Sequence, residues 1–434
     1  MELMLGYSCP DGYKQTEVGV IPEDWEVSHL ESITDPKRAI SYGIVQTGPN
    51  LPNGIRCLRV VDIDHGKINT GDMITTSKTI SDSYKRTILK AEDLVMPLRG
   101  KVGDVAIVGE DLAGCNLTRG VALIAVRSDW SARYCRQYIW SSSTRKRLEQ
   151  SMNGSALQEI PIATLRSFKI ALPPTKAEQE SIAKALSDAD ALIECLEQLI
   201  TKKRHLKQGA MQELLTGKKR LPGFSGEWEL KTFAQVFDFS GGFSASRDQL
   251  SSKGHCYLHY GDIHKSSKTF IDLQAEYQEI PKLDIPLKRV SPASLLDDGD
   301  VVFVDASEDD EGASKHVVII NKDKATYIAG LHTIVAKSKT DGLDHTYLRY
   351  CFQTREIKRQ FYYYAVGTKV TGISKTNIAK LALPVPPRSE QTAIATVLAD
   401  MDAEVAALET RLAKTRSLKQ GMMHNLLTGK IRLV

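Results

Sequence analysis

The sequence predicts an α/β fold: two domains of α+β layout and two long antiparallel coiled-coil helices, arranged as an internal two-fold repeat. Three observations predict it. A segment of more than forty residues occurs twice, a proline-rich stretch precedes each copy, and apolar residues within each copy recur at alternating steps of four and three. Because the two chain ends also resemble a continuous piece of the same repeat, the arrangement is pseudo-cyclic.

The repeat begins at Glu178 as EQESIAKALSDADALIECLEQLITKKRHLKQGAMQELLTGKKRL and at Glu390 as EQTAIATVLADMDAEVAALETRLAKTRSLKQGMMHNLLTGKIRL. Matched residues keep a constant offset of 212 positions, from Glu178 with Glu390 to Gly217 with Gly429. Chance does not maintain such a register. A weaker match lies upstream, where LRVVDI (58–63) parallels LHYGDI (258–263). The chain is therefore two copies of one unit, each a domain followed by a long helix.

These boundaries define four segments. We predict a first domain over residues 1–170, a first spacer helix over 171–216, a second domain over 217–382 and a second spacer helix over 383–434. Pro174 and Pro387 stand just ahead of the helices, where a proline costs no intrahelical hydrogen bond.

The chain ends complete each other. The first helix runs into GKKRLPGFSGEWEL (217–230), whereas the chain stops at GKIRLV (429–434). The missing continuation stands near the N-terminus as GVIPEDWEV (19–27), with Trp25 placed like Trp228. This predicts pseudo-two-fold symmetry, with the two termini meeting.

The apolar residues of each helix form an a/d stripe, here called the seam. Its members are Ile182, Leu186, Ala189, Ile193, Leu196 and Ile200 in the first copy and Ile394, Leu398, Met401, Val405, Leu408 and Leu412 in the second. Some forty helical residues make a rod of roughly 60 Å. Neither seam buries itself alone, so we expect the two helices to pair. Gly209 and Gly421 inside the pattern mark either a kink or the close approach of another helix.

Composition limits the class of protein. The net charge is +4, and seven scattered cysteines contain no CxxC pair, which predicts reduced thiols in a cytoplasmic protein. No apolar run approaches the roughly 18–20 residues of a membrane span, and no secretory signal stands at the N-terminus. Basic residues gather over 201–220 and 411–432, on either a solvated helical face or a surface for phosphate or a partner.

Two variable domains alternating with two near-identical helices resemble the specificity subunit of Type I restriction–modification systems. GVIPEDWEV, the repeats with LKQG and LLTGK, and the proline-rich entries carry the resemblance over essentially the whole chain. It implies that each domain is a target-recognition domain reading half of a bipartite site in double-stranded DNA. It also implies that the helices set the gap between the half-sites and bind methyltransferase subunits, with restriction subunits in the full complex. Methylation and cleavage belong to other chains, so we expect no enzymatic activity and no cofactor.

Candidate DNA-binding residues stand in loops that resemble those of the family. VMPLRGKVGDVAIV (95–108) nominates Arg99 and Lys101, NLTRG (116–120) nominates Arg119, and GLHT (330–333) nominates His332. Matching loops at Gly154 and Ser155, and at Gly367, Thr368 and Lys369, suit a phosphate. Ordinary surface charge is the alternative for each basic residue.

The second domain departs from the first at DDGDVVFVDASEDDEG (297–312), where acids replace the arginine–glycine loop. A solvent loop, or carboxylates that read cytosine amino groups, explains it better than a catalytic metal site, because no ExK stands at nuclease spacing. His255, His259, His264 and Cys256 lack a second ligand pair at finger spacing, so we predict no metal site. Phosphate-loop, adenine-methylase and hydrolase motifs are also missing.

Some apolar residues lie off the seam. These are Leu192, Leu199, Leu206 and Ala407, which we predict to bind two methyltransferase subunits per chain in a four-helix bundle. A coiled-coil adaptor that scaffolds proteins without reading DNA is the alternative from another class, and the mild net charge favours it.

Overall fold

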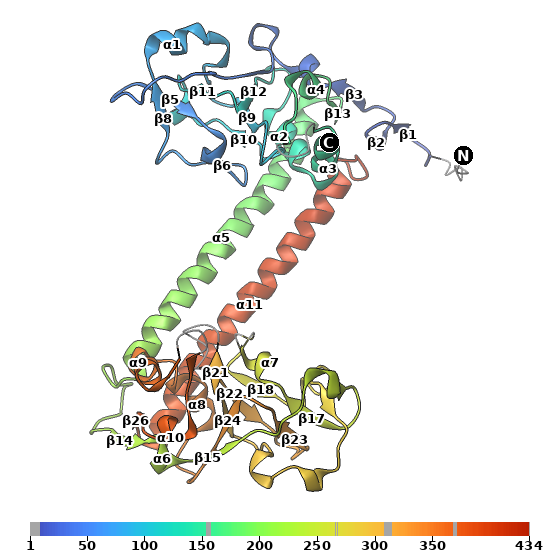
Figure 1. The fold of residues 1–434 in the computed structure, drawn as a ribbon. Coiled ribbons are helices and arrows are strands. Elements are labelled where there is room, and N and C mark those ends of the chain that lie inside the picture. The colour runs from blue at the N-terminus through green and yellow to red at the C-terminus, as the bar shows by residue number, and fades with distance from the viewer. Residues whose placement is uncertain are drawn as a thin grey trace. The chain divides into compact units, whose positions relative to one another are not determined.

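The computed structural model describes residues 9–152, 158–264, 266, 268–307, 315–367 and 371–433 (Figure 1). The chain divides into two compact units. The first contains Met1–Glu197 and Arg411–Val434, and the second contains Gln198–Thr410. Each unit therefore holds one mixed α/β domain and parts of both long helices, which is the two-domain repeat predicted from the sequence.

The two long helices are α5 (Lys176–Leu214) and α11 (Arg388–Leu426), each of 39 residues. Both begin directly after the proline-rich stretch and end at the repeated LLTGK. Gly217 and Gly429 adopt left-handed backbone, with φ of +71° and +70°, which is the usual geometry of a glycine just beyond a helix C-terminus. The repeated sequence thus fixes both ends of each helix.

The domain of the first unit is built mainly from short strands. Its strands are β1 (Tyr13–Thr16), β2 (Gly19–Pro22), β3 (Glu26–His29), β4 (Ser41–Tyr42), β5 (Ile55–Leu58), β6 (Ile63–Asp64), β7 (Lys67–Ile68), β8 (Ile74–Thr76), β9 (Leu94–Pro97), β10 (Ala106–Ile107), β11 (Asn116–Leu117), β12 (Val121–Ile124) and β13 (Lys169–Leu172). Its helices are α1 (Lys78–Ser83), α2 (Ala132–Trp140), α3 (Ser142–Gln150) and α4 (Ile162–Arg166). The main sheet has the order β10-β9-β12-β4, a second has β11-β5-β8, and β13 pairs with β3.

The domain of the second unit follows the same plan with longer strands. Its strands are β14 (Glu229–Thr232), β15 (Phe237–Gly241), β16 (Leu250–Ser251), β17 (His255–Leu258), β18 (Phe270–Asp272), β19 (Lys282–Leu283), β20 (Val301–Val304), β21 (Ala306–Ser307), β22 (His316–Ile320), β23 (Tyr327–Ala329), β24 (Thr333–Ser338), β25 (Thr371–Gly372) and β26 (Ala382–Val385). Its helices are α6 (Phe233–Val236), α7 (Tyr260–His264), α8 (His345–Cys351), α9 (Arg355–Tyr364) and α10 (Lys375–Ile378). The sheets have the orders β15-β24-β20-β22-β18 and β16-β19-β17-β23, while β14 pairs with β26.

The two domains match in backbone hydrogen bonding as well as in sequence. The Leu58 carbonyl accepts from Thr118 N at 3.0 Å, and the Leu258 carbonyl accepts from Gly330 N at 2.9 Å. The preceding residues pair equivalently too, since Ile44 N donates to the Leu117 carbonyl and Phe243 N donates to the Ala329 carbonyl, both at 2.7 Å. The weak likeness of LRVVDI and LHYGDI therefore reflects one shared frame.

The first turns of each long helix are buried in a domain core. Ile182 and Leu186 are fully buried in a cluster with Trp25, Tyr134 and Leu427. Ile394 and Leu398 pack likewise with the aromatic core around Phe233 and Phe303. The start of the predicted seam thus packs on the domain, because the adjacent domain offers a larger apolar surface than one helix does.

Ion pairs between α5 and α11 repeat in both units. In the first unit Lys419 pairs with Asp190 at 2.5 Å and Arg416 with Glu197 at 2.6 Å. In the second unit the residues 212 positions away pair in the same way, Lys207 with Asp402 and Arg204 with Glu409. In each unit the partners run in opposite sequence order. The 212-residue repeat therefore extends to the ion pairs between side chains of α5 and α11.

The remaining global features concern membranes and thiols. No helix of the described residues is long and apolar enough to cross a membrane. All seven cysteines are free, and burial raises the pKa of the Cys57 and Cys135 thiols to about 12.

Candidate DNA-binding loops and helical docking faces

Two loops of the first domain meet at one edge of its main sheet. The loop after β9 carries Arg99 and Lys101, and the turn between β11 and β12 carries Arg119. Leu98 N donates to the Gly120 carbonyl at 2.9 Å, and Arg119 N donates to the Ile44 carbonyl at 2.9 Å. A Cβ on Gly120 would lie 3.7 Å from Arg99 Nε, so the Arg99 guanidinium lies directly against this turn. The structure therefore places Arg99 against the turn that carries Arg119, and Lys101 stands two residues further along the same loop.

The three basic side chains differ in their partners. Arg119 is exposed and Arg99 is half-buried, and neither guanidinium has a hydrogen-bond or ion-pair partner among the described residues. Lys101 pairs with Asp64 and donates to the Ile63 carbonyl at 3.3 Å. The hydrogen bond from Lys101 lowers the pKa of the Asp64 carboxyl. The two arginines are therefore available to a ligand, whereas Lys101 is partly neutralised.

Apolar side chains stand exposed beside these arginines. Tyr42 is 41% exposed, Val45 is 45% exposed and Val61 is 69% exposed. Ile44 and Thr118 form a parallel bridge, which places the segment from Tyr42 to Val45 along the turn that carries Arg119. Arginines next to exposed apolar groups suit base edges, which present acceptors and the thymine methyl group. Sequence patterns did not single out these apolar residues, because only the bridge places Tyr42 and Val45 beside Arg119, and only the fold brings Val60, the neighbour of Val61, against Gly120.

The corresponding turn of the second domain contains His332. His332 has a left-handed backbone with φ of +59°, and its side chain is 49% exposed. Asp305 N donates to the His332 carbonyl at 3.1 Å, as Leu98 N does to Gly120. His332 therefore corresponds to Gly120, and the counterpart of Arg119 is Leu331, which is 40% exposed. GLHT stands at the predicted loop, but a basic side chain does not recur at the Arg119 position.

The candidate phosphate loops are only partly described. Gly154, Ser155, Thr368 and Lys369 lie outside the described residues. Gly367 is described and exposed, with φ of +134°. Its proposed contact with phosphate stays a prediction.

The acids before β20 have structural partners. Lys337 donates to Asp297 at 2.7 Å and to Asp300 at 2.6 Å, and burial raises the pKa of Asp300. Asp298 accepts from Asn321 N at 2.9 Å. His259 Nδ1 accepts from Gly261 N at 3.0 Å. In the part of the chain that the structure describes, no group of histidine, cysteine and acidic side chains is placed to hold a metal ion.

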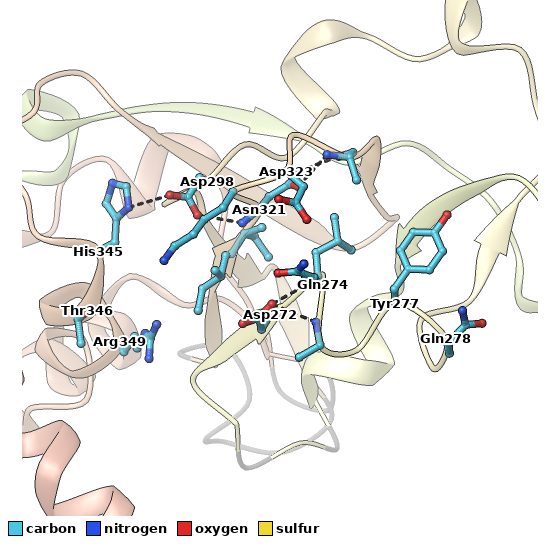
Figure 2. Close-up of a pocket in the computed structure, with 16 residues that line it drawn as sticks. Asp272, Gln274, Tyr277, Gln278, Asp298, Asn321, Asp323, His345, Thr346 and Arg349 are labelled. Carbon is cyan, nitrogen blue, oxygen red and sulfur yellow. Dashed lines mark hydrogen bonds and ion pairs between the residues drawn. The ribbon is translucent and has the colours of Figure 1, made fainter.

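A cavity of about 740 Å³ lies in the second domain, lined by three aspartates, Lys322, Arg349 and polar side chains (Figure 2). The aspartates are Asp272, Asp298 and Asp323. Asp298 precedes β20 and Asn321 follows β22, whereas His332 lies beside the other end of β20. The cavity is thus separated from the reading loops by the length of a strand, and its acids disfavour phosphate.

Most of the apolar residues that lie off the seam are exposed on the long helices. Leu192 is 39% exposed and Leu206 is 51% exposed, Ala407 is also exposed, and Leu199 is half-buried. Leu418, the repeat of Leu206, is 65% exposed and was not among the predicted residues. Gly209 and Gly421 stand three residues after these two leucines, and a Cβ on either glycine would meet no atom within 4 Å. Both copies of LKQG thus present a leucine and a glycine on one open helical face.

Comparison with known proteins

Two like domains with equivalent loops, joined to repeated helices, define a class of two-headed proteins built from one repeated unit. The family model for the Type I restriction modification DNA specificity domain matches twice, over residues 22–202 and 225–415. The chain belongs to this family, and is therefore a non-catalytic specificity subunit of the Type I class.

Relatives match along most or part of the chain. The putative MjaX specificity subunit of Methanocaldococcus jannaschii is 25% identical over 100% of both chains. The EcoBI specificity subunit of Escherichia coli is 27% identical over 46% of this chain and 42% of its own. A solved specificity subunit from M. genitalium has a TM-score of 0.54 at 14% identity, over 93% of this chain and 96% of the other. The last likeness shows a shared fold.

Proposed function

We propose that this subunit reads a bipartite DNA site with two target-recognition domains and docks methyltransferase subunits on its helices. The observation that carries the proposal is the equivalent position of the two reading loops on one backbone frame, at Arg119 and at Leu331–His332. We assign residues 1–170 and 217–382 to the recognition domains, and 171–216 and 383–434 to the spacer helices. Restriction subunits join through the methyltransferase in the full complex.

The proposed DNA contacts divide into base-reading and phosphate-binding residues. The guanidinium groups of Arg99 and Arg119 have no hydrogen-bond or ion-pair partner among the described residues and match the N7 and O6 acceptors of guanine, whereas Lys101 suits phosphate. His332 occupies the same turn in the second domain. The proposed phosphate contacts are Gly154, Ser155, Gly367, Thr368 and Lys369. Phosphate contacts position the domain, whereas base contacts supply sequence specificity.

The spacer helices are proposed to form an antiparallel coiled coil. The Lys419–Asp190 and Lys207–Asp402 pairs support this arrangement, because each belongs to one unit and both follow the 212-residue repeat. An antiparallel pair of fixed length would set the gap between the half-sites. Leu196, Ile200 and Leu412 are buried residues of the seam and would contribute its apolar contacts.

The partner is proposed to bind off this seam. Leu192, Leu199, Leu206 and Ala407 would contact methyltransferase helices, one subunit per repeat and two per chain. Support comes from the open helical faces at Leu206 with Gly209 and at Leu418 with Gly421. An exposed mid-helix glycine costs about 1 kcal/mol relative to alanine. Close approach of a partner helix explains the glycine, because a residue without a side chain leaves room for the partner's backbone.

Selection from random duplexes tests the proposal, with the methyltransferase subunit present. Recovery of two short motifs separated by a fixed gap supports the DNA reader. Binding without any sequence preference, together with a stable protein complex, supports the coiled-coil adaptor instead. Arg119→Ala is the matched variant, and we expect it to relax one half-site while the other half-site and the gap remain. Its guanidinium is exposed and makes no hydrogen bond or ion pair with the described residues, so the variant should fold normally.

A further inference from the structure

The second domain presents a carboxylate at the edge where the first domain presents arginines. Asp305 follows β20, and its N–H donates to the His332 carbonyl at 3.1 Å, which is the ladder position of Leu98 in the first domain. The described acids Asp297, Asp298 and Asp300 precede β20 and are held at its other end. Among the described acids of residues 297–312, Asp305 therefore lies beside the reading turn.

One oxygen of the Asp305 carboxylate has no hydrogen-bond partner among the described residues. Its Oδ1 is fully enclosed and makes no hydrogen bond with the described residues, while His332 Nδ1 lies 3.3 Å away, within ion-pair distance. The side chain is nevertheless 34% exposed, so its exposed area belongs to its other atoms. Oδ1 is thus covered by the fold, whereas the rest of the side chain remains partly exposed.

Aromatic rings hold the neighbouring imidazole. His332 lies edge-on to Tyr260, with ring centroids 5.4 Å apart, and Tyr260 packs on His259 at 4.7 Å. Burial and the nearby Arg247 guanidinium lower the pKa of His259, which keeps that ring neutral at neutral pH. Because His332 Nδ1 faces Asp305, His332 Nε2 points away from the Asp305 carboxylate. The row of rings packs on His332, whose Nδ1 faces the enclosed Oδ1 of Asp305.

A carboxylate on a DNA-facing edge has one favourable kind of contact. Phosphates repel it, and guanine offers acceptors at N7 and O6 in the major groove. The exocyclic amino groups of cytosine and adenine are the donors in that groove, and acidic side chains pair with the cytosine amino group. The chemistry of this edge is therefore the opposite of that at Arg99 and Arg119.

We propose that Asp305, positioned by His332, accepts a hydrogen bond from an exocyclic base amino group in the second half-site. The inference rests on the proposed function and adds the chemical group that is read. The first domain would read acceptor groups, and the second would read a donor group. A cytosine or an adenine supplies this donor, and the two sources are separated by the test.

The test is duplex selection by the complex containing wild-type chain, Asp305→Ala or Asp323→Ala. Asp323 is an exposed acid of the same domain at the opposite strand end, so it matches the charge change. We expect Asp305→Ala to lose preference at one base pair by roughly 5- to 150-fold, within one half-site only. Its affinity for non-specific DNA should stay equal or rise, since a charge that repels phosphate is lost. Asp323→Ala should keep the wild-type motif.

Base analogues identify the amino group directly. Replacing the selected cytosine by 2-pyrimidinone, or the selected adenine by purine, removes that amino group and should weaken wild-type binding. The same replacement should have little further effect on Asp305→Ala, because the partner is already gone. The nearly isosteric Asp305→Asn, which changes the shape of the site least, should shift preference toward adenine, whose N6 and N7 match an amide.

Opposite results overturn the inference. If Asp305→Ala selects the wild-type motif with higher affinity, Asp305 reads no base. Because the wild-type complex would still select a split motif in that case, the proposed function would remain intact. If the wild-type complex selects no split motif, the proposed function and this inference both fail.

Discussion

Arg432 joins the C-terminal segment of the first unit to its N-terminal segment, and Arg432→Met should weaken this junction. Its guanidinium contacts Glu178 at the start of α5 at 2.5 and 2.8 Å, and Asp24 of the N-terminal segment at 2.9 Å through two nitrogens. It also stands 5.9 Å from the Trp25 ring centroid. The Glu178 side chain is 0% exposed, so Arg432→Met leaves a buried carboxylate without its cation.

The size of the effect follows from that burial. Removing one partner of a buried ion pair costs about 3–5 kcal/mol. Arg432 itself is 30% exposed, and water reaches its side of the pair, so we expect about 2–3 kcal/mol here. At about 1.4 kcal/mol per factor of ten, exchange of the protected amides near Gly429 and Tyr13 should accelerate roughly 30- to 150-fold.

The second unit contains the matched control. Arg220 contacts Glu390 in the same way at 2.5 Å, and the Glu390 side chain is also 0% exposed. Trp228 Nε1 additionally donates to Glu390 at 3.0 Å, whereas the equivalent Trp25 Nε1 is buried without a partner in the described structure. Moreover, residues 220–228 are one continuous segment, whereas Arg432 and Asp24 are 408 positions apart in the sequence. Arg220→Met should therefore cost less than Arg432→Met.

Hydrogen–deuterium exchange read by mass spectrometry measures both variants, peptide by peptide. Peptides near residues 429–433 should lose protection in Arg432→Met, and those near 217–228 should lose less in Arg220→Met. The double variant Arg432→Met with Glu178→Gln should recover part of the protection, because the buried charge is gone. Equal loss in the two single variants, or no recovery in the double variant, refutes the reasoning from buried charge.

Three further outcomes are expected. A heptad inserted between Leu196 and Ile200, and matched between Leu408 and Leu412, lengthens each helix by roughly 10 Å. Duplex selection should then return the same half-sites with a gap longer by about two to three base pairs. An unchanged gap in a folded variant would contradict the idea that helix length sets the gap. Exchanging residues 28–165 for another recognition domain should change one half-site and keep the gap in the same selection, whereas loss of both half-sites would show that the domains are not independent. Leu206→Asp and Leu418→Asp should each remove one methyltransferase subunit, as measured by native mass spectrometry, and Tyr277→Asp is the control at an exposed position. A wild-type chain that saturates at one subunit would contradict the prediction of two docking faces.

The sequence was informative where one residue type has one structural use. The prolines and LLTGK set the ends of α5 and α11, because proline suits a helix start and glycine a left-handed end. The matched motifs NLTRG and GLHT also lie at equivalent turns, since Thr118 and Gly330 make the same backbone hydrogen bond. Such features depend on the local chain and survive in any context.

Features that depend on contacts distant in sequence were not predicted. The repeated Glu-Gln pair gave no sign of its role, yet Glu178 binds Arg432 while Gln179 accepts from Ser131 N at 3.0 Å and fixes the helix to the domain. The seam pattern did not show that Ile182 packs on the domain, since an apolar stripe does not specify what covers it. The position of Asp305 could not be predicted because the corresponding loops differ in length. The sequence offset that relates Gly330 to Thr118 changes along the acidic segment.

The reading loops combine a fixed backbone with side chains that the fold does not use. The backbone at Leu98, Gly120, Asp305 and His332 carries the hydrogen bonds that hold each turn. The Arg119 side chain makes no hydrogen bond or ion pair in the described structure, and its counterpart Leu331 is exposed. Substitutions at exposed positions of this kind usually change stability by less than about 0.5 kcal/mol, whereas a good base contact discriminates by about 1–3 kcal/mol. One frame can therefore carry an arginine-rich edge in one domain and a carboxylate edge in the other, because the contacts that specify DNA are separate from those that specify the fold.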